Sequence, residues 1–215
     1  MKRIFFPVFA FLLVSACNNT NDASLSGSME LESGILETET ILPDGIGKTD
    51  MKITFDHHGA RKLTEMTTSM TMAGSPMNTK TTLLIKDGYM YSWMNMTKKG
   101  NKMKLNPSAV EAGQGLDFTN ITEGMKSRYH FKDEAKETVA GKSAQVYSFG
   151  LDKMKGKVCL WKGVPLKSEV NVNGKIITTN FKNLQENIDI ASSAFDLPSD
   201  IEFTEVAVPN RAATP

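Results

Sequence analysis

Apolar residues recur at every second position over most of the chain, which is typical of strands that bury one face of a sheet. Met51, Ile53 and Phe55 alternate with polar residues, and the methionines between residues 66 and 72 follow the same period. The dipeptides Asp87-Gly88 and Asn173-Gly174 each separate two such runs, and both are strong hairpin signals. The pattern therefore predicts about ten or eleven strands that follow one another as antiparallel hairpins.

The run that begins at residue 89 is bulky and apolar on both faces. Tyr89, Tyr91 and Trp93 share one face, whereas Met90, Met94 and Met96 share the other. A strand with one solvated face would be polar on that face. We therefore expect this strand to be covered on both sides.

The periodicity changes in the middle of the chain. Phe118, Ile121, Met125 and Tyr129 recur at helical spacing, with Asp117 in place as the N-cap. A sheet of so many twisted strands must curl, and this helical segment is available to cover it. We expect a mainly β (α+β) fold in which a curved antiparallel sheet of about eleven strands forms an unclosed barrel with a helical lid.

The first seventeen residues have a different character. A basic pair, Lys2-Arg3, precedes an apolar run at residues 4–14, and the small residues that follow end in Cys17. This order is typical of a secretory signal peptide. The segment Val14-Ser15-Ala16-Cys17 resembles the lipobox of bacterial lipoproteins, which implies that the thiol of Cys17 receives a diacylglycerol.

A lipidated Cys17 determines where the protein works. Two or more acyl chains hold a protein stably on a membrane, so we expect a lipid-anchored protein of the cell envelope, on its periplasmic or surface side. Asn18, rather than aspartate, follows the cysteine, which favours the outer membrane over the inner membrane. The expected organisation is a signal peptide (1–16), a lipidated cysteine with a flexible tether (17–27), one half-barrel domain (28–206) and a polar tail (207–215).

Composition narrows the partners. The chain has 25 basic and 24 acidic residues, and loss of Lys2 and Arg3 with the signal peptide leaves a net charge of −1. A near-neutral chain without a basic block lacks the electrostatic footprint of a nucleic-acid-binding protein. We expect a monomer whose partners are the membrane and a hydrophobic ligand or a lipoprotein.

Three later segments carry a family resemblance. They are residues 139–147 (Val-Ala-Gly-Lys followed by Val-Tyr), residues 158–169 (Val-Cys-Leu-Trp-Lys-Gly-Val-Pro-Leu-Lys-Ser-Glu) and residues 191–198 (Ala-Ser-Ser-Ala-Phe-Asp-Leu-Pro). Together they resemble envelope lipoproteins of the LolA/LolB-like superfamily, over about residues 26 to 206. The resemblance implies about eleven antiparallel strands around a hydrophobic cavity closed by helices, and a cargo of lipid-modified proteins or free lipids. Arg128 is the candidate for the arginine by which such a carrier closes its lid.

Methionine is the residue type that best fits such a cavity. The chain has 13 methionines, and methionine is flexible and polarisable, which suits surfaces that accept varied apolar partners. The alternative is that the same side chains fill a solid core. The residues expected to line an acyl-chain cavity are Met66, Met70, Met72, Met90, Met94, Met96, Phe118, Ile121 and Met125.

Two other functions are compatible with the sequence. Met70-x-Met72 and Met94-x-Met96 each place two thioethers on one strand face, and thioethers select Cu(I); His57, His58 and His130 are further candidate ligands in a copper-binding protein. A lipoprotein that docks a partner through an exposed face with Tyr89, Tyr91 and Trp93 is the other possibility.

Enzymatic function has little support in the sequence. The chain lacks Gly-x-Ser-x-Gly, Cys-x-x-Cys and His-Glu-x-x-His, the commonest short motifs of hydrolases, thiol oxidoreductases and zinc proteases. Cys159 alternates with apolar neighbours and is expected to be a buried strand thiol that packs as a small hydrophobe. We therefore predict no catalytic residues, no metal and no cofactor.

Overall fold

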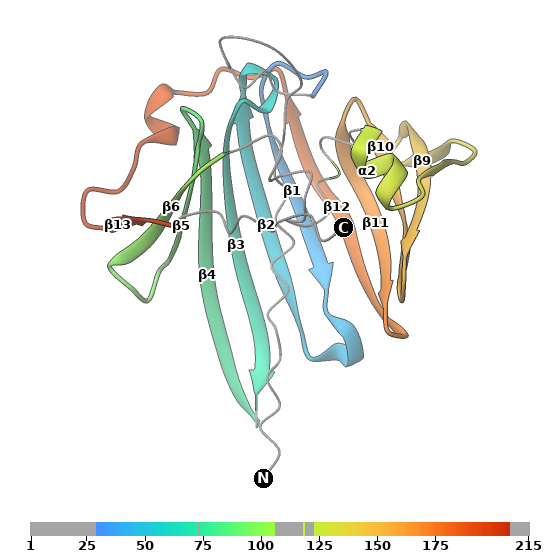
Figure 1. Cartoon of the computed structure of the whole chain (residues 1–215), viewed down its shortest axis with the longest axis horizontal. Coiled ribbons are helices and arrows are strands. Elements are labelled where there is room, and N and C mark those ends of the chain that lie inside the picture. The colour runs from blue at the N-terminus through green and yellow to red at the C-terminus, as the bar shows by residue number, and fades with distance from the viewer. Residues whose placement is uncertain (1–28, 73, 106–117, 119–122, 207–215) are drawn as a thin grey trace, which may run out of the picture.

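The structure, a computed structural model, describes residues 29–72, 74–105, 118 and 123–206. These residues form one thirteen-stranded sheet that does not close (Figure 1). Its strand order is β13-β6-β5-β4-β3-β2-β1-β12-β11-β10-β9-β7, with β8 paired to β9 off this path. All neighbours are antiparallel except β13 and β6, which are parallel. The predicted unclosed, largely antiparallel sheet is therefore confirmed.

The strands have the following bounds: β1 (Gly34–Ile41), β2 (Gly47–Asp56), β3 (Arg61–Met72), β4 (Ser75–Lys86), β5 (Tyr89–Met94), β6 (Lys99–Lys104), β7 (Lys132–Asp133), β8 (Glu137–Val139), β9 (Lys142–Leu151), β10 (Met154–Trp161), β11 (Val164–Val172), β12 (Lys175–Glu186) and β13 (Glu202–Glu205). The first strand lies in the middle of the sheet, where it joins two series of hairpins, β2–β6 and β9–β12. Three short 3-10 turns, η1 (Pro43–Gly45), η2 (His57–Gly59) and η3 (Ser192–Phe195), interrupt the series.

The hairpin turns follow the chemistry that the sequence indicates. At Asp87-Gly88 and Asn173-Gly174 both central residues have positive φ, between 51° and 85°. Positive φ at both positions is the requirement of the type I′ turn, which matches the twist of the flanking strands. The predicted hairpins β4–β5 and β11–β12 are therefore confirmed.

The predicted helical lid is wrong in the part of the chain that the structure describes. The one α-helix found there is α2 (Glu123–Arg128), which has six residues. Such a helix is about 9 Å long, which spans only about two strands at their usual spacing. Gly124 lies inside it, and glycine combined with so short a length disfavours a longer helix. Ile121 and the proposed N-cap Asp117 lie outside the described residues.

Strand register defines two faces of the sheet. Leu36 pairs with Ile53, and their side chains belong to the core cluster that also contains Phe118 and Met125 from the α2 region. We call this side the helix face. The next residues along, Glu37, Lys52 and Glu65, are paired across three strands on the other side, which we call the charged face.

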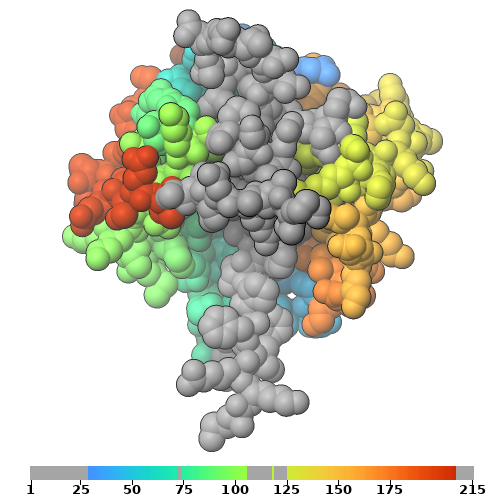
Figure 2. Space-filling view, viewed as in Figure 1, coloured from blue at the N-terminus to red at the C-terminus, as the bar shows by residue number. Residues whose placement is uncertain are grey.

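Strand β5 is covered on both faces, as predicted. Met90 packs with Ile85 and Leu105 on the helix face. On the charged face, Tyr91 packs with Leu84 and with Phe195 of η3. The C-terminal segment crosses the sheet here before β13 joins the edge of β6, and the space-filling view shows β13 against the strands at that end of the molecule (Figure 2).

Candidate functional site

A continuous row of hydroxyl side chains crosses the helix face. Its members are in register on six adjacent strands, from β11 through β12, β1, β2 and β3 to β4. All are half-buried except the member on β11, Ser168, which is buried. We call this set the hydroxyl row: Ser168, Thr179, Thr40, Thr49, Thr68 and Thr79.

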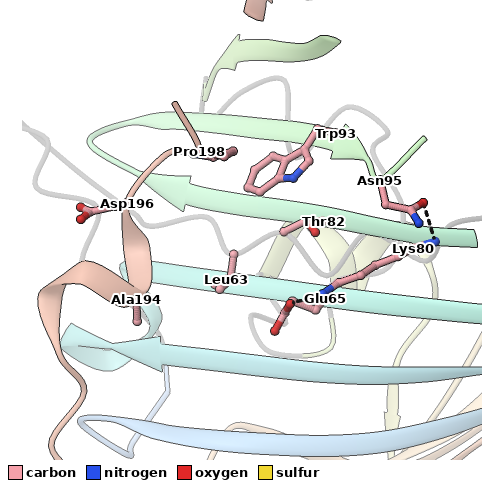
Figure 3. A pocket seen from close by; sticks show the side chains of 9 residues that line it. All are labelled: Leu63, Glu65, Lys80, Thr82, Trp93, Asn95, Ala194, Asp196 and Pro198. Carbon is pink, nitrogen blue, oxygen red and sulfur yellow. Dashed lines mark hydrogen bonds and ion pairs between the residues drawn. The ribbon is translucent and has the colours of Figure 1, made fainter. Parts of the chain in front are cut away.

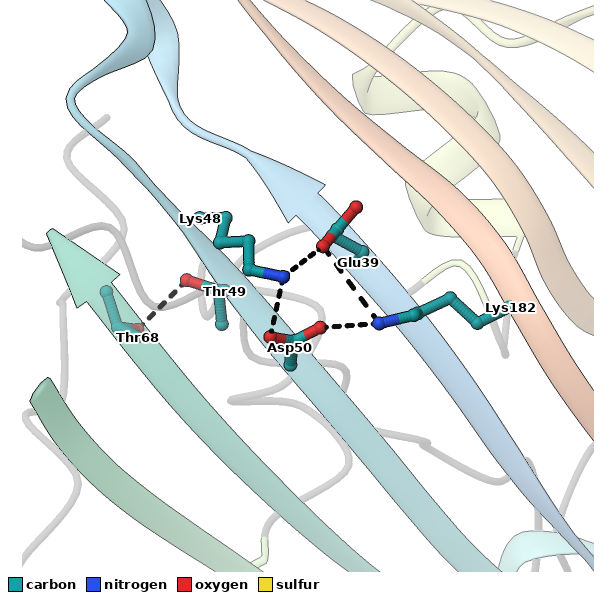
Figure 4. Close-up of polar contacts among 6 residues, drawn as sticks. All are labelled: Glu39, Lys48, Thr49, Asp50, Thr68 and Lys182. Atoms are coloured by element: carbon teal, nitrogen blue, oxygen red, sulfur yellow. Dashed lines mark hydrogen bonds and ion pairs between the residues drawn. The ribbon is translucent and has the colours of Figure 1, made fainter.

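Hydrogen bonds link neighbours within the row. The Oγ1 atoms of Thr40 and Thr179 are 2.9 Å apart. Those of Thr49 and Thr68 are also 2.9 Å apart, as Figure 4 shows for this second pair. A hydroxyl has one donor hydrogen and two acceptor lone pairs. One member of each pair donates to the other, so each pair keeps one hydrogen that can be donated to a further partner.

The next row on the same face is mainly apolar. We call it the mixed row, and it consists of Phe181, Thr38, Met51, Met66, Thr81 and Met94. Thr38 is only 2% exposed, and its Oγ1 has no hydrogen-bond partner within the part of the chain that is described. Its register neighbours, Met51 and Phe181, are both apolar. A buried polar atom without a partner is uncommon in proteins and calls for an explanation.

Charged side chains on the same strands lie on the opposite face. Lys48 and Asp50 flank Thr49 in sequence, and they form a network with Glu39 and Lys182 (Figure 4). The Lys48 Nζ lies 2.6 Å from a carboxylate oxygen of Glu39, and the Lys182 Nζ lies 2.8 Å from one of Asp50. The hydrogen bond from Lys182 lowers the pKa of Asp50, and the bonds to Glu39 and Asp50 raise the pKa of Lys48. Exposed pairs of this kind add little stability, but they show that these four charged side chains lie on the face opposite the hydroxyl row.

Several of the residues expected to line a cavity are buried on the helix face. Met66 is 7% exposed in the mixed row, and Met90 is 8% exposed in a separate cluster with Ile85 and Leu105. Phe118 and Met125 belong to the main core cluster. The structure therefore brings Phe118 and Met125 into one cluster and places Met90 in another. Met66 lies on β3, between the strands of these two clusters.

The other expected residues have different positions. Met70 is half-buried, whereas Met94 and Met96 are 41% and 72% exposed. The side chain of Met72 and all of Ile121 lie outside what the structure describes. Arg128 is exposed, and its guanidinium carbon lies 5.5 Å from the ring centroid of Tyr129.

Lys62 is a residue of the helix face that the sequence analysis did not single out. It pairs in register with Phe55 and Ile85 and is 1% exposed. A lysine is almost never so completely buried unless it has a partner. The sequence did contain a signal for this position. Lys62 is separated from Met66 and Met70 by even numbers of residues on one strand, so all three lie on the same face.

A pocket of about 320 Å³ lies on the charged face (Figure 3). It is partly open to solvent, and strands β3, β4 and β5 form its floor beside η3 and the segment that follows η3. Glu65 and Lys80 in this pocket are 2.7 Å apart, and the Trp93 ring lies edge-on to Phe203 at 5.7 Å. None of the predicted cavity residues whose side chains the structure describes lines it; the lining residues are Leu63, Glu65, Lys80, Thr82, Trp93, Asn95, Ala194, Asp196 and Pro198.

Cys159 is a free, buried thiol, as predicted. Its Sγ lies 3.9 Å from a carboxylate oxygen of Glu137. Burial and, next, the charge of Glu137 raise the pKa of the thiol. A thiol held in its protonated form is a poor nucleophile, so the site does not have the chemistry of a catalytic cysteine.

Among the residues that the structure describes, no three His, Cys, Asp or Glu side chains gather as a metal site. His57 and His58 lie in η2, where the Nδ1 of His58 is 3.0 Å from the carbonyl oxygen of Met29. No helix in the described ranges is long and apolar enough to cross a membrane.

Comparison with known proteins rests on structure alone. No family model matches the chain, and no curated protein does. A conserved protein from Thermus thermophilus, described as uncharacterized, has a TM-score of 0.53 at 9% identity, covering 85% of this chain and 93% of that one. This likeness shows a shared fold.

Two further solved structures have lower scores. The MucA/MucB complex of Pseudomonas aeruginosa has a TM-score of 0.48 at 15% identity, covering 82% of this chain and 60% of the matched chain. A putative outer membrane lipoprotein-sorting protein domain from Vibrio parahaemolyticus has a TM-score of 0.32 at 14% identity, covering 76% of this chain and 89% of that domain.

Proposed function

We propose that this protein is a non-enzymatic, lipid-anchored envelope protein that binds an acyl-chain ligand, a lipid or an acylated protein, on the helix face of its open sheet. A role in lipid or lipoprotein transport follows from such binding. The proposal includes the organisation expected from the sequence, with lipidation at Cys17, a tether to residue 27 and the sheet domain at residues 28–206.

The observation that carries the proposal is the separation of side chains between the two faces. On the helix face, neither the hydroxyl row nor the mixed row contains a charged side chain across the strands from β12 to β4. On the charged face, the same strands carry Glu39, Lys48, Asp50 and Lys182. Binding sites for apolar ligands are largely apolar, with a few polar groups that fix orientation, and the helix face has this composition.

Met94 offers a direct test, because it belongs to the mixed row and is 41% exposed. A charge introduced there has access to water, so Met94→Glu leaves folding intact but places a carboxylate beside the bound acyl chain. We expect the affinity for the apolar fluorescent probe N-phenyl-1-naphthylamine to fall at least tenfold. Asn78→Glu on β4 is the matched control, because Asn78 is exposed on the charged face. Equal affinities for the two variants and the unchanged protein would count against binding on the helix face.

A second candidate is partner docking on the charged face, and the pocket beside Trp93 favours it. Trp93 is half-buried there with Pro198 and Thr82 (Figure 3), and tryptophan is enriched at the centres of protein interfaces. Trp93→Ala would weaken such a complex without changing the binding of the apolar probe. The two candidate functions thus make different predictions: Met94→Glu weakens probe binding if the first is right, and Trp93→Ala weakens partner binding if the second is right.

A further inference from the structure

We propose that the hydroxyl row and Thr38 recognise the uncharged ester groups of an acylglycerol. This inference rests on the proposed function and names the ligand class: glycerol esters of fatty acids are preferred to free fatty acids. The acyl chains lie along the apolar side chains of the mixed row, and the ester oxygens accept hydrogen bonds from the adjacent hydroxyls.

The geometry of the row fits an elongated ligand with several polar atoms. Six strands at the usual spacing of about 4.8 Å give a row about 24 Å long. The Thr40–Thr179 and Thr49–Thr68 pairs each keep one donor hydrogen after their mutual bond. Ester oxygens are acceptors without a donor, so a row of free hydroxyl hydrogens is complementary to them.

The buried hydroxyl of Thr38 is a second, independent observation that supports a bound ester. Its buried Oγ1 has no partner within the described residues, and it lies on the same face, two residues before Thr40 on β1. The propensity of threonine for strands does not account for it, because valine has the same branched shape and a similar propensity without a buried hydroxyl. A ligand oxygen at this position supplies the missing hydrogen bond.

The distribution of charge decides between ligand classes. A carboxylate or a phosphate held away from water needs a cation or several donors, and both rows lack Lys and Arg. On the strands of the hydroxyl row, the described cations of this face are Lys62 on β3, six residues from Thr68, and Lys175 on β12, four residues from Thr179. These separations correspond to about 20 Å and about 13 Å along the strands. The Lys175 Nζ also lies 2.5 Å from a carboxylate oxygen of Asp44. The rows therefore favour an uncharged polar group over an anionic one.

The test compares monopalmitoylglycerol with palmitate as competitors of N-phenyl-1-naphthylamine. The protein is the full chain with Cys17→Ser, so that it carries no acyl chain of its own. We expect the ester to bind about tenfold more tightly than palmitate. In the variant Thr40→Val, Thr49→Val, Thr68→Val and Thr179→Val, the affinity for the ester falls about tenfold, equivalent to about 1.4 kcal/mol, while the affinity for the apolar probe is unchanged.

The control is Thr67→Val with Thr178→Val, on the same strands β3 and β12 but on the charged face, and it leaves both affinities unchanged. If the variant with four substitutions fails to fold, Thr38→Val alone gives the same loss of preference for the ester over palmitate. Probe binding with an undiminished ester preference in these variants overturns the inference and leaves the proposed function intact. Failure of the unchanged protein to bind the probe at all overturns both.

Discussion

Replacing Thr38 by valine should stabilise the fold, which is unusual for a change in a buried position. The hydroxyl is 2% exposed and unpaired in the described structure, and leaving a buried polar group unsatisfied costs about 1–3 kcal/mol. Valine keeps the branched shape and puts a methyl group between Met51 and Phe181, where it adds part of the roughly 0.8 kcal/mol of a buried methylene. We expect the free energy of unfolding to rise by about 1–2 kcal/mol.

Urea unfolding followed by tryptophan fluorescence measures this effect on the full chain with Cys17→Ser. An unchanged slope with a higher midpoint identifies a true gain in stability, and the melting temperature should rise by about 2–4 °C per kcal/mol for a chain of this size. Thr40→Val is the matched control on the same strand and face. Its hydroxyl is bonded to Thr179 at 2.9 Å, so this variant should lose about 0.5–1.5 kcal/mol. The reasoning is refuted if both variants lose stability to the same extent.

Three further predictions concern other parts of the molecule. Phe195→Ala should destabilise the fold by about 3–5 kcal/mol, because Phe195 is 1% exposed against Leu84 and Tyr91; urea unfolding measures it, and a loss below about 1 kcal/mol would show that η3 does not cover the charged face. The Cys159 thiol should react with a thiol reagent at pH 8 only under unfolding conditions. Because the pKa of this thiol is raised in the folded state, the free energy of unfolding should fall as the pH rises above about 8.5, the ordinary pKa of a thiol. A Cys159→Ala variant should lack that fall. Lys182→Ala should change the free energy of unfolding by less than about 1 kcal/mol, since Lys182 is exposed on the charged face; a larger loss would assign the network a structural role.

Local signals in the sequence predicted the strands well. The dipeptides at 87–88 and 173–174 encode turns that need positive φ at both residues, and this requirement is local, so sequence is sufficient to find it. The bulky residues on both faces of β5 likewise predicted that both faces are covered, one by the cluster around Met90 and the other by Phe195.

Features that depend on distant pairing could not be predicted in this way. The parallel pairing of β13 with β6 joins residues about a hundred positions apart, and no local pattern specifies it. The hydroxyl row depends on register between strands: Thr49 lies between Lys48 and Asp50 in sequence, and only the pairing with Thr40 and Thr68 shows that it belongs to a row. The periodicity that predicted a helical lid arises because Phe118, Met125 and Tyr129 are all buried against the core, and burial does not require one continuous helix.

Native mass spectrometry of the protein purified from the envelope, combined with organic extraction, tests the central claim most directly. The account predicts one acyl lipid per protein molecule, released on unfolding and identified in the extract as a glycerol ester. A mass equal to that of the protein alone, unchanged after incubation with monopalmitoylglycerol, would contradict it and favour partner docking on the charged face.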